Sequence, residues 1–173
     1  RVKNRWGNLP LHRAAENGHC RAEVTLAILG AQKEGAQVKD KDGGLPLHYA
    51  AWNRNCPAEV TLAILEAHKE AARVKNRWGN LPLHRAAENE HCPAEATLAI
   101  LEAHKGGAHG KGKDGGRPRH YAARNSNCPA QVTLAILGAP KAAARGKTKW
   151  AQPPRHRSAE TGHAPPHATP ASP

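Results

Sequence analysis

Histidine and cysteine recur in this chain at a constant spacing, and both residue types can bind metals or take part in nucleophilic catalysis. Five histidines are 36 residues apart, and so are all four cysteines. They are His12, His48, His84, His120 and His156, and Cys20, Cys56, Cys92 and Cys128. A metal site is therefore the first chemistry to consider. Whether these side chains can meet depends on the elements that carry them.

The same 36-residue spacing separates longer sequence motifs, so the chain is an array of repeats. GNLPLHRAAENGH from Gly7 returns as GNLPLHRAAENEH from Gly79, and weaker copies begin at Gly43 and Gly115. A fixed period of this length predicts units that stack into a solenoid. We expect a repeat array over residues 1–145, divided into four units at about 1–37, 38–73, 74–109 and 110–145.

Each unit carries the signals of a turn followed by two short helices. The sequences NRWG from Asn4 and DKDG from Asp40 are typical of type I turns. Pro10 is placed to begin a first helix, and Pro57 to begin a second, because proline is tolerated at the first helical position. Helices this short are unstable alone in water. Each unit must therefore bury its apolar face against its neighbours.

The phrase LPLHRAAENGH resembles the TPLHxAAxxGH phrase of ankyrin repeats, and it recurs in four copies between Arg1 and about Ala144. The resemblance implies an all-α, ankyrin-like α-solenoid of helix-turn-helix repeats joined by short hairpins or turns. The unit has 36 residues where ankyrin repeats have about 33. The extra residues are expected between the two helices and after the second. The capping threonine of the family is replaced by Leu9, Leu45, Leu81 and Arg117.

The repeat spacing argues against a metal site or a disulfide. Equivalent residues of stacked units lie roughly 10 Å apart, whereas a disulfide needs Cα atoms within about 7 Å. The cysteines are expected to be half-buried, reduced thiols at the start of each second helix, which predicts an intracellular, cytoplasmic protein. The ankyrin resemblance implies that the histidines from His12 to His120 bond backbone groups between repeats.

Patterns typical of enzymes and membrane proteins are missing from the sequence. It has no recurring pair of carboxylates, no glycine-rich phosphate loop after a strand and no serine nucleophile motif. Its apolar runs are far shorter than the roughly 18 residues of a membrane helix. We therefore expect no enzyme, no cofactor, no metal and no membrane contact.

The net charge of +12 is unevenly distributed. Acidic and basic residues balance in 38–73 and 74–109, whereas 110–173 has eleven basic residues and two acidic ones. A nucleic-acid-binding protein is expected to have its cluster of basic residues on the folded part of the chain. We interpret 146–173 as an eroded repeat trace and a disordered, basic, Pro-rich tail. Nucleic-acid binding through the basic region 110–157 stays an alternative.

The fourth unit has arginine at two positions where the third has leucine. Arg117 and Arg119 replace Leu81 and Leu83. An unpaired charge inside a continuing stack is strongly unfavourable. At the end of a stack, however, arginine can lay its stem on the preceding repeat and extend its charged group into water. We expect the array to end at this unit, by capping or by decay.

The remaining candidate for function is the surface of the array. The resemblance implies binding through the hairpin tips and the exposed side of each first helix, and Trp, Tyr and Arg are enriched in interface hot spots. The candidate contacts are Arg5, Trp6, Arg13, Glu16, Asn17, Tyr49, Trp52, Asn53, Arg77, Trp78, Arg85, Glu88, Tyr121 and Arg124. Trp6 and Trp78 could instead pack against neighbouring hairpins.

We therefore expect a non-catalytic protein–protein interaction module that is part of a larger protein. The identity of its partner protein is not encoded in any motif that we find. A repeat fragment that is eroding without a selected function is a further alternative.

Overall fold

The computed structural model describes residues 2–19, 21–91 and 93–138, and all the regular secondary structure within these ranges is helical. Each unit has a first helix of seven residues and a longer second helix. The first helices are α1 (Pro10–Glu16), α3 (Pro46–Trp52), α5 (Pro82–Glu88) and α7 (Pro118–Arg124). The second helices are α2 (Ala22–Ala31), α4 (Ala58–Ala67), α6 (Ala94–Ala103) and α8 (Ala130–Leu137). Three short 3-10 helices follow α2, α4 and α6: η1 (Lys33–Gln37), η2 (Lys69–Arg73) and η3 (Lys105–His109).

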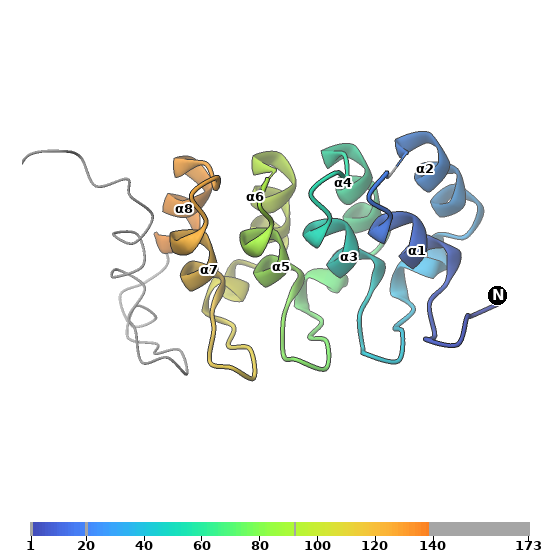
Figure 1. Cartoon of the computed structure of the whole chain (residues 1–173), viewed down its shortest axis with the longest axis horizontal. Helices are drawn as coiled ribbons and strands as arrows, with labels where there is room; N and C mark the ends of the chain where they lie inside the picture. Colours follow the sequence, from blue (N-terminus) through green and yellow to red (C-terminus); the bar gives the residue numbers. More distant parts are fainter. Residues whose placement is uncertain (1, 20, 92, 139–173) are drawn as a thin grey trace, which may run out of the picture.

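The units stack side by side in sequence order, as Figure 1 shows. The first helices form one layer, in which each contacts the next, and the second helices form the other layer. Hairpin loops project from one edge of the stack. The predicted all-α solenoid is confirmed. The expected repeat trace and tail at 146–173 lie outside the described residues.

Each first helix begins at proline, as predicted, although no hydroxyl caps it. Leu45 occupies the cap position in an extended conformation and is 1% exposed. Its backbone amide donates to Nδ1 of His48 at 3.1 Å. The amide of His48, which a capping hydroxyl would accept, donates instead to the carbonyl of Leu45 at 2.9 Å.

The second helices begin one residue later than predicted. Pro57 has a ψ of 142°, which lies outside the helical region, and α4 starts at Ala58. Pro93 likewise precedes α6, with a ψ of 113°. Proline therefore stands at the cap position, and not at the first helical position that the sequence predicted.

The core between units is made of small and branched aliphatic side chains, and each unit completes it for its neighbour. Val60 and Val132 are fully buried against the preceding unit. Val24 is the equivalent residue of the first unit, and it is 51% exposed. The comparison shows that burial comes from stacking, as expected of a solenoid.

The hairpin tips are tied to one another by backbone hydrogen bonds. The amide of Lys41 donates to the carbonyl of Trp6 at 3.1 Å, and the same bond recurs at the next two tips, at 2.7 and 2.8 Å. Gly7 has a φ of 81°, and a Cβ placed on it would lie 2.9 Å from the amide nitrogen of Lys41. Glycine at this position therefore lets successive tips approach closely.

In the part of the chain that the structure describes, every helix is too short or too polar to cross a membrane.

Candidate functional site

An open groove of about 820 Å³ crosses the C-terminal ends of the first helices. Four equivalent positions, one from each unit, set its character: Glu16, Trp52, Glu88 and Arg124. All four line the groove, and Tyr121 lies beside them. The indole of Trp52 is 52% exposed. The groove therefore combines an aromatic centre with acidic and basic neighbours.

Ion pairs hold most of the charged groups around the groove. Arg13 pairs with Glu16 within α1, and Arg85 pairs with Glu88 in α5 at 2.9 Å. These pairs are partly exposed, so each contributes no more than about 1 kcal/mol to stability. Among the described residues, Arg124 has no carboxylate within ion-pair distance. Arg124 is therefore available to an anionic group.

Arg54 and Glu90 also line the groove, although they were not among the predicted site residues. They form an ion pair at 3.0 Å that joins the second and third units. Each lies two residues beyond Trp52 or Glu88 in the sequence, in the turn after the first helix. The repeat register alone could have found them.

The two tyrosines are half-buried, and their hydroxyls are used within the protein. Tyr49 donates to a carboxylate oxygen of Asp40, and Tyr121 donates to Asp114 at 2.9 Å. Burial, reinforced by the adjacent carboxylate, raises the pKa of both phenols above the usual value. Each ring also meets the histidine of the preceding unit edge-on, as in the 5.9 Å separation of Tyr49 and His12. The phenols therefore brace the hairpins against the helices.

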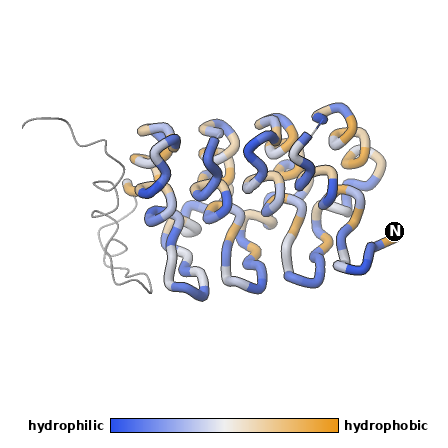
Figure 2. Tube along the Cα trace, in the orientation of Figure 1, coloured by the Kyte–Doolittle hydropathy of each residue, from blue (hydrophilic) through white to orange (hydrophobic). Residues whose placement is uncertain are grey.

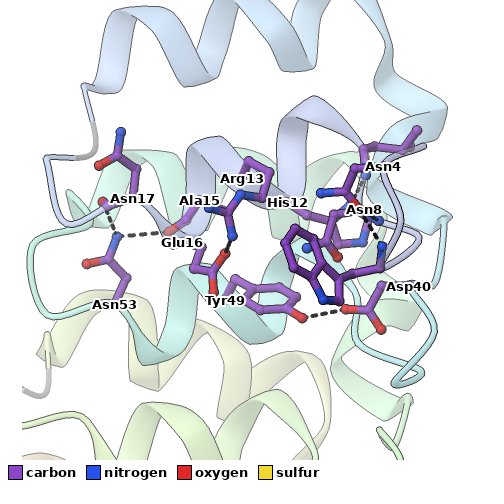
Figure 3. Close-up of polar contacts among 12 residues, drawn as sticks. Asn4, Asn8, His12, Arg13, Ala15, Glu16, Asn17, Asp40, Tyr49 and Asn53 are labelled. Atoms are coloured by element: carbon purple, nitrogen blue, oxygen red, sulfur yellow. Dashed lines mark hydrogen bonds and ion pairs between the residues drawn. The ribbon is translucent and has the colours of Figure 1, made fainter. Parts of the chain in front are cut away.

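Asn53 does not face outwards as predicted. It is 7% exposed, and its side-chain amide donates to the carbonyl oxygens of Ala15 and Asn17, each at 2.8 Å (Figure 3). Asn89 repeats the contact to Ala51 at 3.0 Å. Asparagine at the end of a helix is commonly an exposed capping residue, which is why the sequence predicted exposure. Here the side chains bond to carbonyls of the preceding unit, a contact that the local sequence does not show. Asn17 in the first unit is exposed, as predicted.

The tryptophans at the hairpin tips are exposed and stack with arginine. Trp6 is 53% exposed, and the guanidinium of Arg5 lies 3.9 Å from its ring centre. Trp78 is 42% exposed, with Arg77 at 4.4 Å. Each stack is formed by two adjacent residues of one tip. The predicted exposure is therefore confirmed.

Two buried histidines connect the units through backbone groups, as the resemblance implied, whereas Nε2 of His12 is buried without a hydrogen-bond partner among the described residues. Nε2 of His48 lies 3.1 Å from the carbonyl oxygen of Asn80, and Nε2 of His84 lies 3.1 Å from that of Gly110. Nδ1 accepts a backbone amide in each case, so the proton of the neutral ring resides on Nε2. Burial lowers the pKa of His48 and of His84 to about 4.

The two cysteines that the structure describes lie in the core or pack against it. Cys56 is buried, and its sulfur accepts the hydroxyl of Thr61 at 3.8 Å. Cys128 is half-buried, whereas Cys20 and Cys92 lie outside the described residues. Across residues 2–19, 21–91 and 93–138, no three histidine, cysteine or acidic side chains are grouped so that they could hold a metal ion.

Arg119 does not extend its charged group into water. It is 1% exposed, and Nη2 lies 3.0 Å from Nδ1 of His109. Burial, followed by the charge of the nearby arginines, lowers the pKa of His109, which favours the neutral ring that can accept this bond. Arg119 is therefore accommodated by an internal acceptor. Arg117 is also buried, at 9% exposed, so the predicted solvent exposure of both arginines is wrong.

Comparison with protein-family models and with curated proteins finds no match to this chain. The structure itself establishes a repeat protein built from stacked helix pairs with a 36-residue period. The basic residues between 139 and 157, which contribute to the nucleic-acid alternative, lie outside the described residues.

Proposed function

We propose that the chain is an ankyrin-like repeat module that binds a partner protein through its first-helix faces and hairpin tips, without catalysis. The groove around Trp52 is the centre of this contact. The LPLHRAA phrase, the paired helices and the imidazole bonds between units support the ankyrin assignment. We assign the extra residues of the 36-residue unit to the segment after the second helix, where η1, η2 and η3 lie.

The exposed indole of Trp52 within the groove carries the proposal. Isolated exposed apolar residues are ordinary on protein surfaces. Trp52, however, shares one hollow with Tyr121 and Arg124, and these three residue types dominate binding hot spots. Solenoids also bind partners along surfaces that extend over several units. A peptide or loop that inserts an apolar side chain against Trp52 and places an acidic group near Arg124 fits these side chains.

Selection of peptides from a random library on the intact chain would test this function. Peptides of about twelve residues are long enough to cross several units, because an extended chain covers roughly 3.3 Å per residue and stacked units lie roughly 10 Å apart. We expect Trp52→Ala to weaken the selected peptides at least about tenfold, as for a hot-spot residue. Leu134→Ala removes an apolar side chain that is 67% exposed and lies outside the groove. Equal binding by both variants would contradict the proposed site.

A further inference from the structure

Every hairpin tip carries two basic residues that are separated by one residue. We call these residues, together with Trp6 and Trp78, the tip ridge: Lys3, Arg5, Lys39, Lys41, Lys75, Arg77, Lys111 and Lys113. All eight basic side chains are exposed. The hairpins that carry them form the mostly hydrophilic loops along one edge of the stack (Figure 2).

The acidic residues near the tip ridge are few and already engaged. Asp40 and Asp114 accept the hydroxyls of Tyr49 and Tyr121. Asp42 pairs with Arg77 at 2.7 Å. Among the described residues, the other seven basic side chains of the ridge have no ion-pair partner. The ridge therefore holds an excess of positive charge that its own fold does not neutralise.

Hydrogen bonds between tips keep this charge in one line. Backbone bonds join each tip to the next, as described above. In addition, the ammonium group of Lys3 donates to the carbonyl of Lys39 at 3.2 Å, and that of Lys75 donates to Lys111 at 3.1 Å. Four tips at roughly 10 Å intervals form a ridge about 30 Å long. An extended polyanion could contact all four tips.

Aromatic rings lie among these cations. Trp6 and Trp78 are more than 40% exposed, and each is stacked with an arginine of its own tip. Proteins that bind single strands combine a line of cations for the phosphates with aromatic and arginine planes on which bases stack. A duplex keeps its bases paired and stacked, so it cannot use exposed indoles in this way.

We propose that the tip ridge binds single-stranded nucleic acid, with phosphates on the lysines and bases stacked at Trp6 and Trp78. This site lies outside the groove at Trp52. It shares the hairpin tips with the proposed partner surface, but it does not depend on the proposed function. It also differs from the alternative in the sequence analysis, since three of its four tips precede residue 110.

Fluorescence anisotropy of a labelled oligonucleotide of about twelve nucleotides, within the site sizes of known single-strand binders, would test the ridge on the full chain. The test variant is Lys39→Ala, Lys75→Ala and Lys111→Ala in one chain. The matched control is Lys33→Ala, Lys69→Ala and Lys105→Ala, which removes the same charge from three other exposed lysines, on the 3-10 helices. We expect the tip variant to bind at least about tenfold more weakly and to reduce the salt slope by about 0.7 for each lost phosphate contact. Equal weakening by both variants would overturn the proposal.

A second variant tests the bases. We expect Trp78→Ala to weaken binding about tenfold or more, within the range for loss of one base stack. A duplex of the same length and vesicles of anionic lipid should bind more weakly than the single strand. If either bound equally well through the same lysines, single-strand recognition would be wrong. Binding that survived the tip variant but was lost when the basic residues of 139–173 were neutralised would also overturn it.

Discussion

The side-chain amide of Asn53 donates at 2.8 Å to the carbonyl of Asn17, 36 residues earlier. It also donates to the carbonyl of Ala15, at the C-terminal end of α1. Carbonyls at the end of a helix lack partners within that helix. Each unit therefore caps the first helix of the unit before it, and the solenoid is held by polar bonds as well as by apolar burial.

Asn53→Ala should destabilise the protein by about 1–3 kcal/mol, because it leaves carbonyls of the preceding unit without their donor. Urea denaturation followed by circular dichroism would measure the change. Asn17→Ala is the matched control, since Asn17 is exposed and has the same place in the first unit. We expect its effect to stay within about 0.5 kcal/mol. Equal destabilisation would show that the amide acts within its own unit.

Stability should fall in mild acid because of His48 and His84. Burial lowers the pKa of both to about 4, whereas an unfolded histidine titrates near 6.5. Below about pH 6.5 the unfolded chain therefore binds protons that the folded chain excludes. The stabilisation is fully present above that pH and decreases as pH falls towards 4, by about 3 kcal/mol for each histidine.

Urea denaturation at a series of pH values would measure this loss. His48→Gln should lower stability near neutral pH. Between about pH 4 and 6.5 it should also reduce the number of protons taken up on unfolding by about one. His91→Gln changes an exposed histidine and is the control. An unchanged pH dependence in His48→Gln would contradict the assignment.

Arg119→Leu should stabilise the protein by about 1–3 kcal/mol, because a well-packed apolar residue can replace a buried charge at no cost or with a gain. Leucine fits the equivalent positions of the first three units, where Leu11, Leu47 and Leu83 are at most 2% exposed. Thermal unfolding would detect the gain as a higher Tm. Arg124→Leu, at an exposed position, should shift the free energy of unfolding by less than about 0.5 kcal/mol. A lower Tm for Arg119→Leu would show that the bond to His109 is needed.

Tyr49→Phe should destabilise the second hairpin by about 1–3 kcal/mol, as expected for a hydrogen bond to a charged group. The ring and its packing on His12 are kept, so only the bond to Asp40 is lost. Hydrogen exchange should accelerate at the backbone amides of residues 40–44. Tyr121→Phe should act in the same way at Asp114 in the fourth unit. Unchanged exchange in both variants would mean that the tips are held by their backbone bonds alone.

The repeat pattern made much of the fold predictable. The 36-residue period, the proline at the start of each first helix and the turn glycines correspond to stacked units with the expected elements. The exposure of Trp6, Trp52 and Trp78 followed from their positions in the register. These features depend on local propensity and on periodicity, which are properties of the sequence.

Only the tertiary structure decided which polar groups are internal. Asn53 and Arg119 resemble surface residues in sequence, yet both are buried. Asn53 finds its acceptor on the preceding unit, and Arg119 finds its acceptor, His109, in the segment before its own hairpin. The basic residues of the tip ridge likewise come together only because the hairpins of successive units lie side by side. Local sequence establishes which elements form, whereas the partners of a side chain depend on distances between units, and these distances are set by stacking.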